Sequence, residues 1–204
     1  HFLYNTLDTI SWMARDYGAG DVVRLVDALT NMFRIGLSRG RDYISVEQEL
    51  SYVANYLYIQ KIRYGGKLNY QIVKDEEILN EEVPKLMLQP LVENAIYHGM
   101  EFMDGDGEIT LKVWKEGEDL YFTVRDNGLG MTREQVESLF SDTILVTSKK
   151  GSGIGVKNVN ERIKLYFGEE YGLRIDSEPD EGTEITIHLP AVPYSRILAE
   201  GGER

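Results

Sequence analysis

Residues 126–130 read Asp-Asn-Gly-Leu-Gly, residues 151–155 read Gly-Ser-Gly-Ile-Gly, and upstream lies Glu93-Asn94-Ala95. Each stretch alone has an ordinary explanation, because Asp-Asn-Gly is a common turn and glycine-rich segments also serve as flexible linkers. In this order along one chain, the three stretches predict a pocket for a purine nucleotide whose phosphates lie under a glycine-rich lid. This combination therefore indicates both the chemistry and the fold.

The length and composition limit the number of domains and exclude several classes of site. The chain has 204 residues, which suffices for one or two domains with a hydrophobic core. It contains no cysteine, so disulfides and thiolate metal sites are excluded. No apolar run is long enough to cross a bilayer. The chain begins at His1 without an initiator Met, so we expect it to be part of a longer protein.

The negative charge of the chain is unevenly distributed. The net charge is −12, and residues 1–40 hold four basic and four acidic side chains, so the remainder supplies all of it. Such an acidic body disfavours nucleic acid and anionic lipid as partners. A polyanion such as ATP can still bind where backbone amides and Mg²⁺ supply a local positive potential.

The first 40 residues show helical periodicity. Apolar residues recur at helical spacing over residues 1–17, Gly18-Ala19-Gly20 interrupts the pattern, and Asp21 is expected to cap a second helix. The short glycine-containing link predicts an antiparallel helical hairpin. A lone hairpin cannot bury both of its faces, so we expect dimerisation into a bundle. The alternative is that the hairpin packs only on its neighbouring domain.

The rest of the chain alternates between helical and strand patterns. Ser45 and Gln48 form a capping box that predicts a third helix ending near Arg63. The later pattern predicts an α+β sandwich in which a mixed sheet packs on helices. The expected strands are 67–74, 108–115, 120–125, 173–177 and 184–189, and the expected helices are 85–97, 132–140 and 156–167.

The chemistry of the nucleotide pocket follows from residue types. A carboxylate at a strand end, Asp126, can accept a hydrogen bond from an exocyclic amine, which favours adenine over guanine. Gly128 and Gly130 lack a Cβ atom, so the backbone can approach a flat base closely. The glycines of residues 151–155 precede a helix, whose N-terminus and amides together attract phosphate.

A polar residue inside an apolar helix is the next candidate. Asn94 lies within such a stretch, and its side-chain oxygen is a suitable hard ligand for Mg²⁺. The alternative is an Asn on a solvated helix face. His98, one turn later, could meet the phosphates or cap the end of the helix. His188 alternates with Glu184 and Thr186, which indicates a solvent-facing strand residue.

These stretches resemble the ordered sequence boxes of the GHKL ATP-binding domain (the Bergerat fold), in the LytS/YesM-like branch of bacterial sensor histidine kinases. Residues 88–95, Leu-Gln-Pro-Leu-Val-Glu-Asn-Ala, resemble its N box, and residues 126–130 resemble its G1 box. Residues 151–162 resemble its G2 box, and Gly182-Thr183 before an alternating strand resembles its last box. The resemblance covers nearly the whole chain.

The resemblance implies a role for each matching residue. Asp126 would bind the adenine amine with assistance from Thr183, and Asn94 would ligate Mg²⁺. The residues that would surround the phosphates are Gly151, Gly153, Gly155 and Asn158. Residues 141–152 would form the ATP lid.

One position departs from the pattern of the family. Tyr97 stands where a Lys is often found. The corresponding phosphate contact is therefore missing, or it is replaced by Lys149 or Lys150.

The beginning of the chain resembles the segment around the phosphorylated histidine of the same branch. Residues 1–7 read His-Phe-Leu-Tyr-Asn-Thr-Leu. Imidazole has a pKa of about 6.5, so near neutral pH much of it is an uncharged nucleophile. Asn5, one turn along, could position a water or orient the phosphoryl group. His1 has no preceding turn to support it here, so we expect this chain to bind ATP but to phosphorylate itself slowly.

The resemblance implies a cytoplasmic region of a membrane-anchored two-component sensor. It would bind Mg-ATP, transfer the γ-phosphoryl group to His1, and pass it to an aspartate on the receiver domain of a response regulator. Residues 1–40 would form the dimerisation and phosphotransfer hairpin of a homodimer, residues 41–193 the ATP-binding domain, and residues 194–204 a flexible tail. We expect no nucleic-acid partner, and no membrane contact from this segment.

Two other functions are compatible with the same fold. An ATP-hydrolysing machine, as in the topoisomerase and chaperone relatives, uses a Glu four residues before the Mg²⁺-binding Asn. That position is Pro90, which cannot transfer a proton, and Glu93 lies about 100° round the helix from Asn94. The other alternative is a dimeric signalling module that binds nucleotide without efficient phosphotransfer.

Overall fold

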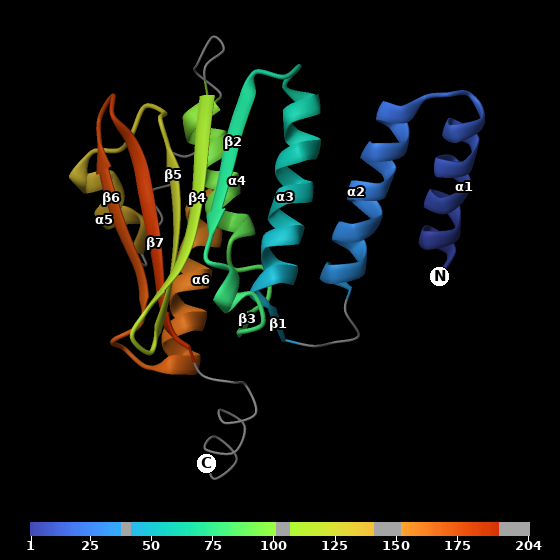
Figure 1. Ribbon diagram of the computed structural model, residues 1–204. Coiled ribbons are helices and arrows are strands. Elements are labelled where there is room, and N and C mark those ends of the chain that lie inside the picture. Colours follow the sequence, from blue (N-terminus) through green and yellow to red (C-terminus); the bar gives the residue numbers. More distant parts are fainter. Residues whose placement is uncertain (38–41, 101–106, 141–151, 192–204) are drawn as a thin grey trace.

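The computed structural model describes residues 1–37, 42–100, 107–140 and 152–191 (Figure 1). The helices are α1 (Phe2–Asp16), α2 (Gly20–Gly36), α3 (Val46–Arg63), η1 (Glu76–Ile78), α4 (Gln89–Met100), α5 (Arg133–Phe140) and α6 (Ser152–Phe167). The strands are β1 (Tyr43–Ser45), β2 (Leu68–Lys74), β3 (Glu82–Pro84), β4 (Gly107–Glu116), β5 (Asp119–Asp126), β6 (Gly172–Glu178) and β7 (Gly182–Pro190). The expected tail at 194–204, Lys149 and Lys150 lie outside the described residues, as does the expected lid except Ser152.

The main sheet has five strands in the order β2-β4-β5-β7-β6. Strand β2 runs parallel to β4, and the other neighbours are antiparallel, so the sheet is mixed as predicted. The register places Ile109 opposite Asp126, and Asp126 opposite Thr183. The two residues expected to contact adenine therefore lie side by side at one end of β5 and β7.

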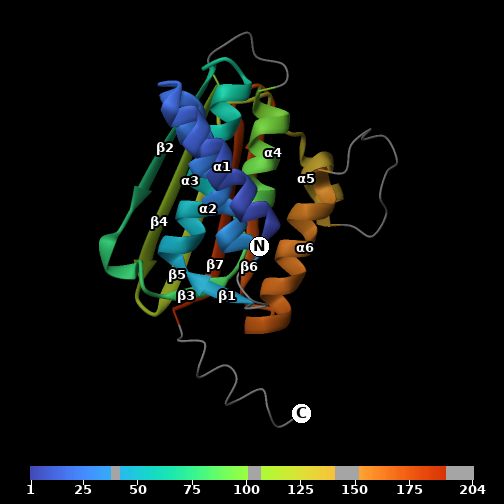
Figure 2. The same cartoon turned by 90° about the vertical axis from the view of Figure 1, so that its right-hand side faces the viewer.

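The structure has three layers. Helices α3, α4 and α6 cover one face of the main sheet, and the α1–α2 hairpin lies on the far side of these helices (Figures 1 and 2). Helix α2 packs on α3, and α1 packs on α2. The α+β architecture and the helical hairpin predicted from the periodicity are both confirmed.

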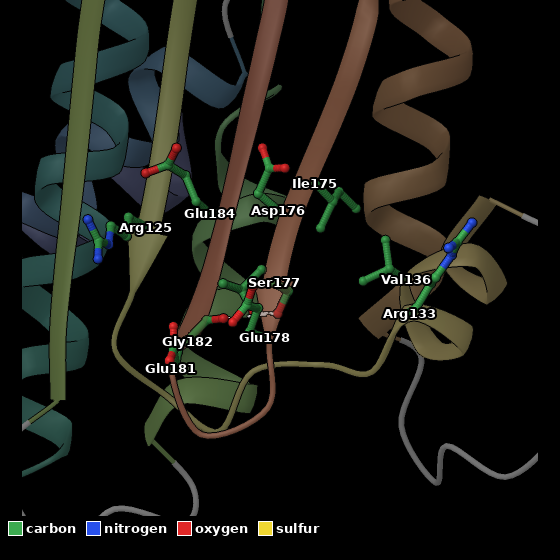
Figure 3. A pocket seen from close by; sticks show the side chains of 11 residues that line it. Arg125, Arg133, Val136, Ile175, Asp176, Ser177, Glu178, Glu181, Gly182 and Glu184 are labelled. Atoms are coloured by element: carbon green, nitrogen blue, oxygen red, sulfur yellow. Dashed lines mark hydrogen bonds between the residues drawn. The ribbon is translucent and has the colours of Figure 1, made fainter.

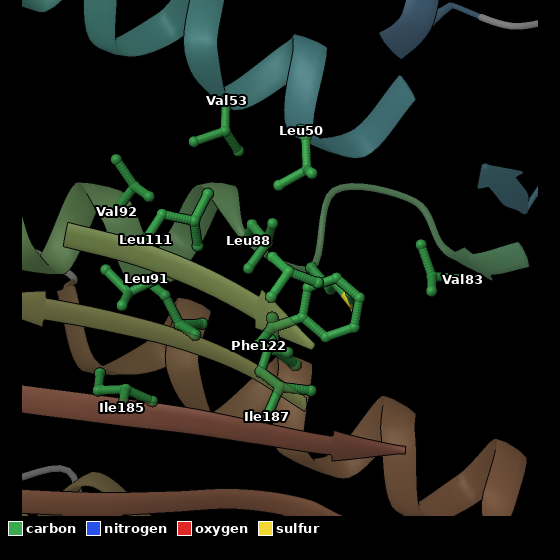
Figure 4. Close-up of a cluster of buried hydrophobic side chains, with 14 of the residues drawn as sticks. Leu50, Val53, Val83, Leu88, Leu91, Val92, Leu111, Phe122, Ile185 and Ile187 are labelled. Carbon is green, nitrogen blue, oxygen red and sulfur yellow. The ribbon is translucent and has the colours of Figure 1, made fainter. Parts of the chain in front are cut away.

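The hydrophobic core lies between the sheet and its helices (Figure 4). Alternate residues of each strand point into it, as period-2 patterns require. Phe122 of β5, Ile187 of β7 and Leu57 of α3 are fully buried. Removing this apolar surface from water is the main favourable contribution to folding.

The open face of the sheet carries a row of stacked rings. Tyr121 stacks on His188 with ring centroids 4.8 Å apart and on Trp114 at 5.3 Å. Asp119 Oδ2 lies 3.0 Å from His188 Nε2, and Lys112 Nζ lies 5.0 Å from the centroid of the Trp114 ring. His188 thus lies on the solvent side as expected, but its neighbours partly cover it.

The capping residues expected for helices α3 and α2 differ in outcome. Helix α3 begins with the predicted capping box, in which the Gln48 amide donates to Ser45 Oγ and the Ser45 amide donates to Gln48 Oε1, both at 3.2 Å. The expected Asp21 cap of α2 is wrong, because the helix begins earlier and Ala19 is its N-cap. Asp21 lies inside the first turn, where it accepts a hydrogen bond from Arg24 at 2.7 Å.

Helix α4 begins at Gln89 and not at residue 85 as expected. The Glu49 carboxylate accepts hydrogen bonds from the backbone amides of Leu86 at 2.8 Å and Leu88 at 2.9 Å. Leu86 has a φ of +58°, which is incompatible with a right-handed helix. A buried carboxylate from α3 therefore holds residues 85–88 as a loop, which the local pattern could not indicate.

Other boundaries also differ from the predicted ones. Helix α6 begins at Ser152, four residues before the predicted start, so Gly153 and Gly155 lie in its first turn and not in a loop. The three-residue strands β1 and β3 pair with each other and were not expected. Such short strands leave no period-2 signal.

Truncation of a core leucine tests this packing. Leu57 is fully buried on α3, whereas Leu165 of α6 is 81% exposed. We expect Leu57→Ala to lower the free energy of unfolding by about 2–5 kcal/mol, because it removes buried apolar contacts and leaves a cavity. Leu165→Ala, the matched control, should change it by less than about 0.5 kcal/mol. Equal losses in urea unfolding would contradict the placement of α3.

Candidate nucleotide-binding site

Asp126 ends strand β5 as a buried carboxylate. Its side chain faces the helices, and the residue is 5% exposed. Oδ1 accepts a hydrogen bond from the Gly128 amide at 2.9 Å, and the Thr183 amide also donates to the carboxylate. Burial raises the pKa of Asp126 to about 6, although the two amide hydrogen bonds lower it. The carboxylate therefore has a strong need for a further donor.

Thr183 is held beside this carboxylate by Ser177 of β6. The Ser177 hydroxyl donates to the Gly182 carbonyl at 2.9 Å and accepts from the Met131 amide at 2.8 Å. It also lies 2.9 Å from Thr183 Oγ1. Because the single proton of Ser177 is used, the Thr183 hydroxyl donates here and keeps its own lone pairs for another donor. Sequence reasoning missed Ser177, although a polar residue at an inward strand position was a signal.

Two glycines let the turns around Asp126 pack together. Gly130 and Gly182 have φ of +64° and +100°. A Cβ atom on Gly130 would overlap the Glu178 carbonyl oxygen, and one on Gly182 would overlap the Asp126 carbonyl oxygen. Gly130 is thus needed for contact between two turns, which differs from its expected role beside a flat base.

Asn94 points into a cavity from the middle of α4. The residue is 1% exposed, and its Oδ1 has no hydrogen-bond partner among the residues that the structure describes. The cavity has a volume of about 340 Å³ and is also lined by Tyr97 and Gly155. The alternative of a solvated helix face is therefore wrong. A buried amide oxygen without a donor fits a hard cation such as Mg²⁺.

Helix α3 forms a wall of the same cavity, which was not predicted. The residues of α3 that line it recur at helical spacing and are Tyr56, Gln60 and Arg63, with Tyr64 at the C-cap. No sequence box marks these positions. These residues line the cavity because α3 packs beside α4, which the sequence pattern does not indicate.

Gly155 brings α6 close to α4. A Cβ atom on Gly155 would lie 3.0 Å from Pro90 Cβ, which is tighter than an ordinary contact. Pro90 and Gly155 both line the cavity of Asn94. The first turn of α6 therefore presents its amides near Asn94, as a phosphate site requires.

The remaining predicted residues are not all placed beside Asn94. Asn158 lies on an exposed position of α6. Gly153 lies in the first turn of α6, and Gly151 lies outside the described residues. His98 belongs to the last turn of α4, and its side chain lies outside the described part.

Glu93 also lines the cavity of Asn94, although it lies about 100° round the helix. Its Oε1 accepts a hydrogen bond from Gln89 Nε2 at 2.8 Å, and Gln89 Oε1 accepts one from the Tyr52 hydroxyl at 3.0 Å. This chain of hydrogen bonds joins α3 to α4 at the edge of the cavity.

Thr183 lines a second cavity, of about 530 Å³, at the edge formed by β6, β7 and α5 (Figure 3). Its lining includes four carboxylates and two guanidinium groups, which belong to Asp176, Glu178, Glu181, Glu184, Arg125 and Arg133. The excess of negative charge makes this cavity unsuitable for a polyphosphate. Asp126 lines neither described cavity, so the adenine end and the phosphate end of the predicted site remain separate in the described residues.

The fold and these side chains together define a class. A mixed sheet covered by α3, α4 and α6 carries a buried Asp at a strand end, an Asn on α4 and glycines opening α6. This is the GHKL class of ATP-binding domain. Residues 1–68 match the family model of the histidine kinases, and residues 80–193 match that of the histidine kinase-, DNA gyrase B- and HSP90-like ATPases. The chain belongs to the latter family, and it is similar to sensor histidine kinases of the LytS/YesM type.

Curated relatives show the same branch. The sensor histidine kinase YesM of Bacillus subtilis is 37% identical over 190 residues, which are 93% of this chain and 31% of the relative. The sensor protein LytS of Bacillus anthracis is 36% identical over 93% of the chain and 32% of the relative. The chain therefore spans about a third of the length of these relatives.

Solved structures share the fold. The histidine kinase domain of the Erythrobacter litoralis EL346 blue-light activated histidine kinase superposes with a TM-score of 0.56 at 17% identity, covering 97% of this chain and 96% of that one. The catalytic domain of histidine kinase ThkA gives 0.53 at 18% identity, covering 74% and 97%. At this identity the likeness concerns the fold alone.

The burial of Asp126 predicts a pH-dependent stability. The pKa of about 6 in the folded state lies above the ordinary 3.8, so stabilisation is present below pH 4 and is lost as the pH rises to about 6. An Asn side chain does not ionise, so the variant Asp126→Asn does not lose stability over this pH range. We expect the stability of the variant relative to wild type to increase by up to about 3 kcal/mol between pH 4 and pH 7 in urea unfolding. A constant difference would contradict the burial of the charge.

A pair of glycine variants tests the contact between the turns. Gly117 and Gly130 both have positive φ, but nothing lies within 4 Å of a Cβ atom placed on Gly117. Gly117→Ala should cost only the strain of the left-handed conformation, about 1–2 kcal/mol. Gly130→Ala adds an overlap with the Glu178 carbonyl and should cost clearly more. Similar losses in unfolding free energy would contradict the close packing of these turns.

Proposed function

We propose that this chain binds Mg-ATP and transfers the γ-phosphoryl group to His1, as the cytoplasmic region of a two-component sensor histidine kinase. The observation that carries the proposal is the buried Asn94, which lines a cavity beside the first turn of α6 and whose side-chain oxygen has no donor among the described residues. Mg²⁺ takes oxygen ligands and keeps waters and phosphate oxygens around it. Asn94 would hold the metal, and the amides of the glycine-rich start of α6 would hold phosphate oxygens.

The adenine end of the proposed site is built around Asp126. In its ionised form the carboxylate has an acceptor for the exocyclic amine, and Thr183 Oγ1 supplies a second acceptor beside it. The Thr183 hydroxyl is oriented by Ser177. Guanine offers a carbonyl at the corresponding position, which the carboxylate would repel. Adenine is therefore the favoured base.

The proposed acceptor is an exposed histidine at the N-cap of α1. His1 Nδ1 lies 3.3 Å from the side-chain nitrogen Nδ2 of Asn5. With the Asn5 amide turned over, its oxygen would accept a hydrogen bond from Nδ1–H, and the lone pair of the imidazole would be on Nε2. Nε2 then attacks the γ-phosphorus, an N–P bond forms, and the bond from the γ-phosphorus to the leaving oxygen of ADP breaks. The Nδ1 proton passes to solvent, which leaves a neutral phosphorylated imidazole.

The hairpin leaves a large apolar surface uncovered. Its exposed apolar side chains are Phe2, Leu3, Ile10, Trp12, Met13, Tyr17 and Val22. Surfaces of this kind mark sites of association. Helix α2 packs on α3, but the apolar side chains named above remain exposed. This surface supports the proposal of a homodimer formed by the hairpins of two copies.

The parent protein and its partner follow from the family. The relatives are named as sensor proteins and sensor histidine kinases. A response regulator would take the phosphoryl group from His1 on one of its aspartates. Helices long and apolar enough to span a bilayer are not found in the part of the chain that the structure describes. Anchoring in the membrane would therefore belong to other parts of the parent protein.

Phosphorylation of His1 is the direct test. With [γ-³²P]ATP and Mg²⁺ we expect a phosphoprotein that is stable in alkali and labile in acid, because N-linked phosphoryl groups hydrolyse when the nitrogen is protonated. His1→Gln should abolish the label. His188→Gln, on the open face of the sheet, is the matched control and should keep it.

The measurement should be made on this chain and on a longer protein that carries the residues preceding His1. Binding of an unreactive ATP analogue with no label in either protein would contradict phosphotransfer and support the nucleotide-binding signalling module. Absence of nucleotide binding by folded protein would contradict the whole proposal.

A further inference from the structure

Two buried amide oxygens, from different helices, line the cavity of about 340 Å³ described above. Asn94 Oδ1 of α4 and Gln60 Oε1 of α3 are both shielded from solvent, and neither has a hydrogen-bond partner among the residues described. Gln60 is 9% exposed as a residue. A buried acceptor without a donor is costly, so a pair of them in one cavity indicates a missing donor or cation.

Tyr56 of α3, one turn before Gln60, lines the same cavity. Burial raises the pKa of Tyr56 to about 12, and the Gln60 side chain acts in the opposite direction by hydrogen bonding. The two side chains are therefore close together at the wall of the cavity that α3 forms.

The lining of this cavity also contains one cationic side chain, that of Arg63. Tyr97 of α4 and Glu93 supply no positive charge. In the described part of the chain, no three His, Cys, Asp or Glu side chains are grouped as a metal site. The lining residues that offer oxygen ligands to a cation are therefore the two amides and the Glu93 carboxylate, and the positive charge available to phosphate is that of Arg63 on α3.

We propose that α3 is part of the Mg-ATP site: Gln60 Oε1 binds the Mg²⁺ ion or one of its waters opposite Asn94, and Arg63 binds a phosphate oxygen. The inference rests on the proposed function and deepens it, because it assigns two residues outside the sequence boxes to metal and phosphate. Arg63 takes the place of the Lys that Tyr97 replaces on α4. Its guanidinium presents several donors to phosphate oxygens, which suits it to this role.

Calorimetric titration with the β,γ-imido analogue of ATP tests Gln60. In wild type, Mg²⁺ should increase the affinity for the analogue. Gln60→Leu should weaken binding about tenfold or more with Mg²⁺ and little in EDTA, because a metal contact is lost and the base contacts remain. Gln60→Glu keeps an oxygen ligand and should restore the Mg²⁺ dependence. Gln71→Leu, at an exposed position of β2, is the matched control and should bind as wild type does.

The outcomes separate this inference from the function on which it rests. Folding of each variant is checked by thermal unfolding without nucleotide. If wild type binds no Mg²⁺-analogue complex, the proposed function fails. If wild type binds it and Asn94→Ala does not, while Gln60→Leu is unchanged, the role of Gln60 is overturned. Equal weakening with and without Mg²⁺ also overturns it, because the effect then concerns packing.

If Gln60→Leu fails to fold, the variant Gln60→Glu provides the test. Loss of the Mg²⁺ dependence in that variant counts against the proposal.

Arg63 has its own test. Arg63→Gln should weaken binding of the triphosphate analogue about tenfold while leaving adenosine binding unchanged, because adenosine lacks phosphates. Lys61→Gln removes the same charge from α3 outside the cavity lining and is the matched control. If both variants weaken binding of the triphosphate analogue equally, the effect reflects the net charge of α3. That result would overturn a direct contact between Arg63 and phosphate.

Discussion

The candidate site is organised around the desolvation of one carboxylate, that of Asp126. Asp126 lies at the end of β5 behind the helices, and among the described residues the amides of Gly128 and Thr183 replace the water it has lost. Those amides reach it because Gly130 and Gly182 let two turns approach each other without side chains between them. A ligand amine that donates a further hydrogen bond to the Asp126 carboxylate would replace part of the lost hydration. The burial of the carboxylate would therefore increase the affinity for such a ligand.

A second buried carboxylate positions the start of α4, the helix that carries Asn94. Glu49 of α3 binds the amides of Leu86 and Leu88 and so determines where α4 begins and how Asn94 is presented. Burial raises the pKa of Glu49 to about 7, although the amide hydrogen bonds and the Arg162 guanidinium of α6 lower it. The Glu49 carboxylate thus joins α3 to the start of α4. Because α2 packs on α3, the hairpin that carries His1 is in contact with the helix that lines the cavity of Asn94.

Much of the fold could be predicted from local patterns. The capping box of Ser45 and Gln48 and the alternating strands were predicted correctly, because their signals lie within a few residues. The pairing of Asp126 with Thr183 had no local signal, and only the resemblance to a family indicated it. The start of α4 was predicted wrongly, since the carboxylate that sets it lies 37 residues before Leu86.

The sequence by itself determined most of the helices and the five strands of the main sheet, the turns that require glycine, and the order of the nucleotide-binding boxes. These are properties of neighbouring residues, and periodicity and backbone sterics decide them. Only the tertiary structure decided that Asp126 is buried, that Ser177 orients Thr183, and that Gln60 shares a cavity with Asn94. Burial and cavity lining depend on which distant segments pack together, and no short stretch of chain carries that information.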